Sequence, residues 1–136
     1  MTIDPMNTPI FGDVLPVNPP RPIRIATALL LGNVALAAAY RVMTALDASF
    51  PIFLVMLALG VWFAVSMRAG RNWARAAATV LSCLSIGMMA WVAGYAVINS
   101  RPTWGWDVGV MVVSGGMLAA AIRLMWRPDV NDYFVP

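Results

Sequence analysis

Four long apolar stretches, separated by short polar or arginine-bearing segments, dominate the pattern of residues along the chain. They cover about residues 25–46, 50–67, 76–98 and 105–126. Because an α-helix rises about 1.5 Å per residue, about 20 apolar residues cross the roughly 30 Å hydrocarbon core of a bilayer. No stretch alternates between apolar and polar positions as a half-buried strand would. The pattern therefore predicts an all-α membrane protein whose four transmembrane helices form an antiparallel bundle.

The segments outside these stretches divide the chain into three parts. Residues 1–22 are rich in proline, which fixes φ and lacks a backbone N–H, so we expect an extended tail. Residues 23–126 form the predicted transmembrane domain, and residues 127–136 form a second tail. In the whole chain, 61% of the residues are hydrophobic and the mean hydropathy is +0.77. A soluble domain of this length cannot bury so much apolar surface, so lipid must cover part of it.

The arginines are distributed unevenly between the two sides of the predicted bundle. All nine basic residues are arginines. Seven lie on the side of the two tails and the 68–75 loop, namely Arg21, Arg24, Arg68, Arg71, Arg75, Arg123 and Arg127. The other side has Arg41 and Arg101, and Arg41 is expected to reach the headgroups from the end of its helix. The positive-inside rule therefore predicts that both termini are cytoplasmic in a plasma membrane.

The chain lacks most of the side chains that carry out catalysis in membranes. It contains no His, Glu or Lys, and Cys83 is its single cysteine. Histidine-ligated haem, paired-cysteine redox chemistry and cysteine-rich metal sites are thereby excluded, and there is no glycine-rich phosphate loop. We therefore expect no enzyme activity, no cofactor, no metal ion and no nucleic-acid partner. Cys83 is interpreted as a small buried residue.

Small residues recur at four-residue spacing on the last three apolar stretches. The pairs are Gly60 with Ala64, Ala90 with Gly94, Gly115 with Ala119, and Gly116 with Ala120. This spacing puts both residues on one helix face, where two backbones can approach closely. Contact within the bundle is the simpler interpretation, and docking of a foreign helix is the alternative. Asn33 is costly to leave unpaired in lipid, so it is expected at a helix interface.

Charged and aromatic side chains near the predicted cytoplasmic surface are candidates for contacts outside the bundle. Those in the 68–75 loop and directly after the fourth stretch are Arg68, Arg71, Trp73, Arg75 and Arg127. We expect them to contact anionic headgroups or, alternatively, an acidic patch on a partner. In the C-terminal tail, Tyr133 and Phe134 are expected at the membrane interface or in a pocket of a partner.

Two short motifs carry a resemblance to known proteins. Gly70-Arg71-Asn72-Trp73-Ala74-Arg75 precedes an apolar helix, and a closing Trp126-Arg127-Pro128 is followed by Tyr133 and Phe134. In these motifs and in its hydropathy, the chain resembles small four-helix membrane proteins of actinobacteria. It is also similar in style to accessory subunits of respiratory or lipid-transport assemblies in those organisms. The resemblance implies a lineage and no activity.

The missing chemistry and the abundant small residues favour a protein that acts through its surfaces. The leading hypothesis is a non-catalytic accessory or assembly subunit of a larger plasma-membrane complex, such as a lipid-transport or respiratory assembly. Its partners would be other membrane-protein subunits and phospholipids. The alternative is a small homo-oligomeric transporter or channel for a neutral or lipidic solute. In that case Asn33 and the serines of the third stretch would line a path.

Overall fold

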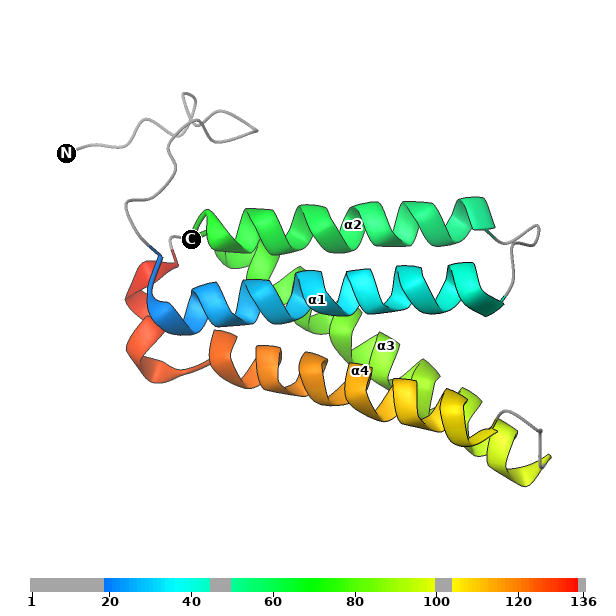
Figure 1. The fold of residues 1–136 in the computed structure, drawn as a ribbon. Helices are drawn as coiled ribbons and strands as arrows, with labels where there is room; N and C mark the ends of the chain where they lie inside the picture. The colour runs from blue at the N-terminus through cyan, green and yellow to red at the C-terminus, as the bar shows by residue number, and fades with distance from the viewer. Residues whose placement is uncertain (1–18, 45–49, 100–103, 135–136) are drawn as a thin grey trace.

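The computed structural model describes residues 19–44, 50–99 and 104–134, and the regular elements in this part are helices. Four long α-helices follow one another along the chain, and a short 3₁₀-helix, η2, follows them (Figure 1). Their bounds are Arg21–Thr44 for α1, Phe50–Arg68 for α2, Asn72–Ile98 for α3, Trp104–Met125 for α4 and Pro128–Tyr133 for η2. The prediction of an all-α protein with four long helices is therefore confirmed.

Each of the four long helices is long and apolar enough to cross a membrane. At most 22% of the most apolar segment of any of these helices is buried inside the bundle. A bilayer would cover the remaining apolar side chains. The described helices are thus compatible with a multi-pass membrane protein.

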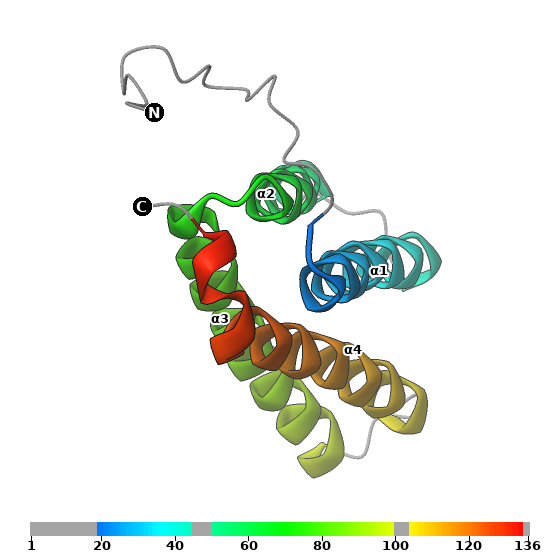
Figure 2. The same cartoon turned by 90° about the vertical axis from the view of Figure 1, so that its left-hand side faces the viewer.

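The long helices pack in a ring, in which α1 lies against α2 and α4, and α3 lies against the same two neighbours. The buried core is concentrated where α1 and α3 begin and where α2 and α4 end. Its largest fully buried side chains are Ile23, Met67, Met125 and Val130. Toward the opposite end, α3 and α4 diverge from α1 and α2 (Figure 1 and Figure 2). One end of the bundle is therefore closed by side chains, and the other is more open.

The first helix begins earlier than the hydrophobic pattern predicts, at Arg21 rather than near residue 25. Pro22 is tolerated in the first turn because the N–H groups there have no partner within the helix. The carbonyl of Pro20 accepts the backbone N–H of Ile23 at 2.9 Å and begins the helical hydrogen bonding. Proline thus belongs to the start of this helix and does not delay it.

A glycine turn ends α2 abruptly. Gly70 has a φ of 78°, which a residue without Cβ adopts at little cost. Its N–H donates to the carbonyl of Met67 at 3.0 Å, and the N–H of Arg71 donates to the carbonyl of Ser66 at 3.4 Å. This pair of bonds is the Schellman arrangement that closes the C-terminus of a helix.

The glycine turn makes the connection between α2 and α3 shorter than predicted. α3 begins at Asn72 rather than near residue 76, so Trp73 and Arg75 are helical residues. The C-terminal tail predicted at 127–136 also has regular structure, because it contains η2. The parts of the predictions that lie outside the described residues concern 1–18, 45–46, Arg101 and 135–136.

Candidate functional site

Arg75 lies at the centre of a cluster formed by the α2–α3 turn, the first turns of α3 and the C-terminal segment. Only 7% of Arg75 is exposed. Its guanidinium carbon lies 4.2 Å from the ring centre of Trp126 and 4.4 Å from that of Phe134. Its Nη1 donates a hydrogen bond to Oδ1 of Asn131 at 2.9 Å. Two aromatic rings and an amide oxygen therefore offset part of the cost of burying this charge.

Hydrogen bonds hold one of these aromatic partners in place. Nε1 of Trp126 donates to Oγ1 of Thr79 at 2.8 Å. The Thr79 hydroxyl in turn donates to the backbone carbonyl of Arg75 at 2.8 Å. The ring that covers the guanidinium is thus connected to the same turn of α3 that carries the arginine.

The C-terminal segment also contacts the glycine turn directly. The Tyr133 hydroxyl donates to the backbone carbonyl of Arg68, and a Cβ at Gly70 would lie 3.1 Å from the Tyr133 carbonyl oxygen. Burial raises the pKa of Tyr133 above its ordinary value, and the positive charge of Arg68 partly offsets this rise. We call the whole set the loop–tail cluster, which comprises Arg68, Gly70, Arg75, Thr79, Trp126, Asn131, Tyr133 and Phe134.

The loop–tail cluster corrects the interpretation of Arg75 and Phe134 as external contacts, and it leaves Tyr133 half-buried. Arg75 was predicted to face headgroups or a partner, but the chain's own tail covers it. Tyr133 and Phe134 pack on the same chain, with their ring centres 5.4 Å apart and Phe134 buried. The sequence gives no sign of the aromatic partners of Arg75, because they approach it only when the tail folds back on α3.

The other predicted surface residues at this end remain accessible to different degrees. Arg68 is exposed, and Arg71 is half-buried. Arg127 is exposed and pairs with Asp129 at 3.0 Å. Trp73 is also exposed, although its ring contacts aromatic side chains of α2. The exposed side chains of Arg68, Trp73 and Arg127 can reach headgroups or a partner, as predicted for this end.

One of the small-residue pairs lies inside the bundle. A Cβ on Gly60 would lie 3.1 Å from Cγ2 of Val34, and Ala64 is fully buried. Gly32 has a similar role that its spacing does not indicate, because a Cβ there would lie 2.9 Å from Cε of Met117. Small residues therefore allow α1 to approach both α2 and α4.

The other three small-residue pairs face away from the bundle. A Cβ on any of their glycines would meet no neighbouring atom within 4 Å, and these glycines are Gly94, Gly115 and Gly116. Their alanines are all exposed, namely Ala90, Ala119 and Ala120. The glycines of these pairs thus make no close contact within the bundle, Gly94 and Gly116 are exposed, and Gly115 is half-buried. The two small residues of each pair do share a helix face, but the rotation of α3 and α4 turns that face away from the neighbouring helices.

Cys83 is exposed, so the prediction of a buried thiol is wrong. It shares one face of α3 with Gly87, Ala90 and Gly94, because residues three or four positions apart are neighbours on a helix surface. All four residues are exposed. We call this line of small side chains the α3 strip.

Two side-chain hydrogen bonds connect α1 with α4. The Ser114 hydroxyl donates to Oδ1 of Asn33, which places Asn33 at a helix interface as predicted. Near the open end, the Tyr40 hydroxyl donates to Oδ1 of Asp107 at 2.7 Å. The second pair was not foreseen, because its members are 67 positions apart and Asp107 lies in the first turn of its helix.

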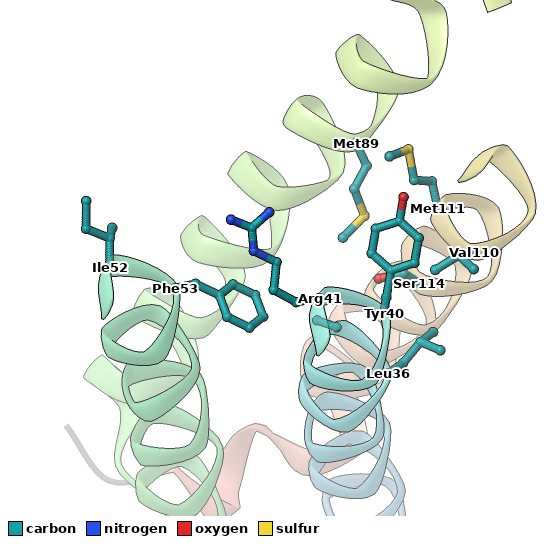
Figure 3. Close-up of a pocket in the computed structure, with 10 residues that line it drawn as sticks. Leu36, Tyr40, Arg41, Ile52, Phe53, Met89, Val110, Met111 and Ser114 are labelled. Atoms are coloured by element: carbon teal, nitrogen blue, oxygen red, sulfur yellow. The ribbon is translucent and has the colours of Figure 1, made fainter. Parts of the chain in front are cut away.

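Two adjoining cavities lie inside the bundle toward its open end, with volumes of about 420 and 410 Å³. Ala37, Phe53 and Met89 line both, and together we call them the bundle cavity. The polar residues that line its deeper part are Asn33, Ser82 and Ser85. In its outer part, Arg41 rises from α1 among apolar side chains of the other helices (Figure 3).

Comparisons with known protein families, with curated proteins and with solved structures found no match to this chain. The resemblance to actinobacterial membrane proteins therefore stays a prediction. Within the described ranges, no group of three or more His, Cys, Asp or Glu side chains could hold a metal ion. The candidate functional features are therefore the outward small-residue faces, the bundle cavity and the exposed arginines.

Proposed function

We propose that this chain is a non-catalytic accessory or assembly subunit of a larger plasma-membrane complex. Its outward faces on α3 and α4 would receive a transmembrane helix of a partner subunit. The observation that carries this proposal is the position of the small-residue pairs. Three of the four pairs have no neighbour inside the bundle at their glycines.

The α3 strip is the most suitable of these faces for a partner helix. In a bilayer, lipid tails are as apolar as leucine, so helices associate through close packing that small residues permit. The strip runs from Cys83 to Gly94 on one exposed side of α3. A partner backbone can approach more closely there than at neighbouring positions such as Trp91, which is 79% exposed.

The proposal includes an antiparallel bundle with both termini in the cytoplasm. Its support is the distribution of the arginines, since most of them lie near the loop–tail cluster and Arg41 lies at the opposite end. In this orientation, Arg68 and Arg127 would meet anionic headgroups or a partner at the cytoplasmic surface.

The native cysteine allows a direct test of docking at the α3 strip. A photoreactive thiol reagent attached to Cys83 in native membranes should cross-link a defined protein, which mass spectrometry then identifies. The matched control is Val55→Cys in a Cys83→Ala background, because Val55 is 57% exposed on α2. The control should not cross-link the same protein.

Substitution in the strip provides the second arm of this test. Gly94→Leu should prevent co-purification of the partner in mild detergent, because it inserts a large side chain where the helices meet. Val55→Leu should leave the complex intact. Migration of the unmodified chain as a lone monomer, without a stoichiometric partner, would contradict the proposal.

A second candidate is a small homo-oligomeric transporter for a neutral or lipidic solute. The lining of the bundle cavity favours it, because Asn33 and two serines of α3 offer polar groups there. The purified chain would then form a symmetric oligomer in liposomes and move a fluorescent lipid across the bilayer, and Asn33→Leu would stop this movement. Absence of transport, together with a cross-link from Cys83 to a different protein, favours the subunit.

A further inference from the structure

The bundle cavity ends at a positive charge. Arg41 lies in the last turn of α1, and its guanidinium carbon is 5.9 Å from the ring centre of Phe53 on α2. Figure 3 shows this side chain extending from α1 toward the space beside α2 and α3. Of the ten residues that line the outer part of the cavity, Arg41 is the one with a formal charge. Its guanidinium therefore borders the cavity instead of simply extending along the membrane surface.

The rest of the lining suits a hydrocarbon chain. The cavity follows α1 from Arg41 to Leu30, which is about 16 Å at about 1.5 Å per residue. Leucine, methionine and phenylalanine side chains form most of the wall of the deeper part. Its volume of about 420 Å³ falls within the range of roughly 300–1,000 Å³ found for small-molecule sites.

The cavity opens toward lipid between α2 and α3. Met56 on α2 and both Leu84 and Met88 on α3 line the cavity. The same three side chains are 48%, 63% and 70% exposed, so they also reach the outer surface and form a rim. A chain from the surrounding bilayer can therefore enter sideways.

The position of Arg41 indicates which chemical group the ligand carries at the end opposite its hydrocarbon chain. The last turn of a spanning helix reaches the headgroup level, where an arginine can meet lipid phosphate. A guanidinium offers parallel N–H groups that match a phosphate in a bidentate manner. The carboxylate of Asp107 also lies at this end, where its Oδ1 accepts a hydrogen bond from the Tyr40 hydroxyl at 2.7 Å. Arg41 is the charged side chain that lines the cavity itself. Charge and shape thus fit a ligand with a phosphate at one end and an acyl chain at the other.

We propose that the bundle cavity binds one acyl chain of an anionic phospholipid whose phosphate lies against Arg41. The bound lipid fills the open end of the bundle and connects α1, α2 and α3. This site is separate from the α3 strip, and it requires neither a partner subunit nor transport of a solute.

Native mass spectrometry of the full chain in mild detergent tests the charged end of this site. The probes are phosphatidylglycerol and phosphatidylcholine with the same acyl chains. The unmodified chain should retain one phosphatidylglycerol about tenfold more tightly, which corresponds to about 1.4 kcal/mol. Arg41→Gln should abolish this preference, and Arg41→Lys should keep part of it. The control Arg123→Gln removes an exposed arginine from the last turn of α4 and should leave the preference unchanged.

Filling the cavity tests the acyl-chain end. Ala37 lines both parts of the cavity, whereas Ala35 is exposed on the same helix. Ala37→Phe should lower the binding of both lipids several-fold, and Ala35→Phe should not. Equal retention of the two lipids by the unmodified chain, or an unchanged preference in Arg41→Gln, overturns the proposal. Undiminished binding in Ala37→Phe overturns it as well. Circular dichroism identifies variants that lose helix, and the lipid comparison on the unmodified chain needs no variant.

Discussion

At the loop–tail end of the bundle, Arg75 is enclosed by two aromatic rings and only 7% exposed, whereas at the cavity end Arg41 borders about 410 Å³ of space. The first arginine contacts the chain's own tail through two aromatic rings and through one hydrogen bond from Nη1 to Asn131. The second has Phe53 as one neighbour and lies beside an opening between helices. Two side chains of the same chemistry therefore have different roles because their surroundings differ.

The difference suggests that the loop–tail end mainly stabilises the fold, whereas the cavity end offers room for a ligand. Buried contacts between distant segments raise the free energy of unfolding, and a loosely packed region is where a ligand finds room. We therefore expect substitutions in the loop–tail cluster to destabilise the fold. Substitutions around the bundle cavity should change lipid binding more than they change stability.

Among the substitutions that compare the two ends, Arg75→Ala is expected to lower the free energy of unfolding the most. The substitution removes two cation–π contacts and a charge-assisted hydrogen bond, and it leaves Asn131 and both rings without their partner. We expect the free energy of unfolding to fall by about 3 kcal/mol. Denaturant unfolding in micelles, followed by circular dichroism, measures it. Arg123→Ala is the control, and an equal loss there would show that Arg75 has no special role.

Gly70→Ala should have the next largest effect, because it acts on the turn that the tail contacts. The positive φ costs a residue with a Cβ about 1–2 kcal/mol. The new methyl group would also lie 3.1 Å from the carbonyl oxygen of Tyr133. We expect a loss of this size in the same unfolding measurement and faster proteolysis of the tail. Gly109→Ala, where a Cβ meets no neighbour, should be neutral or slightly stabilising.

A smaller effect is expected at the cavity end from Tyr40→Phe. This change removes the hydroxyl that donates to Asp107 at 2.7 Å, and we expect a loss of about 1 kcal/mol. A double-mutant cycle with Asp107→Ala isolates the pairwise part of that loss. If the cycle gives a coupling as large as the loss from Arg75→Ala, the two ends contribute equally to stability and the comparison fails.

The smallest effect is expected from alkaline pH, which should weaken the loop–tail end through Tyr133. Because burial raises the pKa of Tyr133, the folded chain keeps this hydroxyl protonated at pH values where the unfolded chain ionises it. Its contribution is complete below the ordinary tyrosine pKa of about 10 and is lost as the pH rises through the raised value. The pH profile of stability should therefore decline gently there. Tyr133→Phe should make this decline shallower than in the unmodified chain, and an unchanged pH profile in Tyr133→Phe would contradict the prediction.

The hydrophobic pattern was sufficient to predict four long helices, because a bilayer requires long apolar stretches whose backbone groups bond within the helix. The boundaries were less accurate where local turn chemistry decides them. Pro22 lies inside the first turn of α1, and Gly70 closes α2 so tightly that α3 begins at once. Hydropathy detects neither effect, because both depend on individual backbone hydrogen bonds.

The candidate sites were harder to predict because they depend on how the helices are rotated. Gly60 and Gly94 have the same four-residue spacing to an alanine, yet Gly60 faces α1 and Gly94 faces outward. Spacing identifies a helix face without telling which way the face is turned. The burial of Arg75 depends on residues that follow α4, and the bond from Tyr40 to Asp107 joins two distant segments. Only tertiary structure brings these groups together.

The order in which the loop–tail cluster is synthesised has a consequence for biogenesis. Arg75 is synthesised before Phe134 and Asn131. Its guanidinium therefore stays exposed to water or headgroups until α4 and the tail have been made. A chain cut after Arg127 would keep all four spans but lose Asn131 and Phe134, which cover that charge. We expect such a chain to insert normally and to be degraded faster in a pulse-chase experiment. The segment that follows α4 would then determine how long an inserted chain survives.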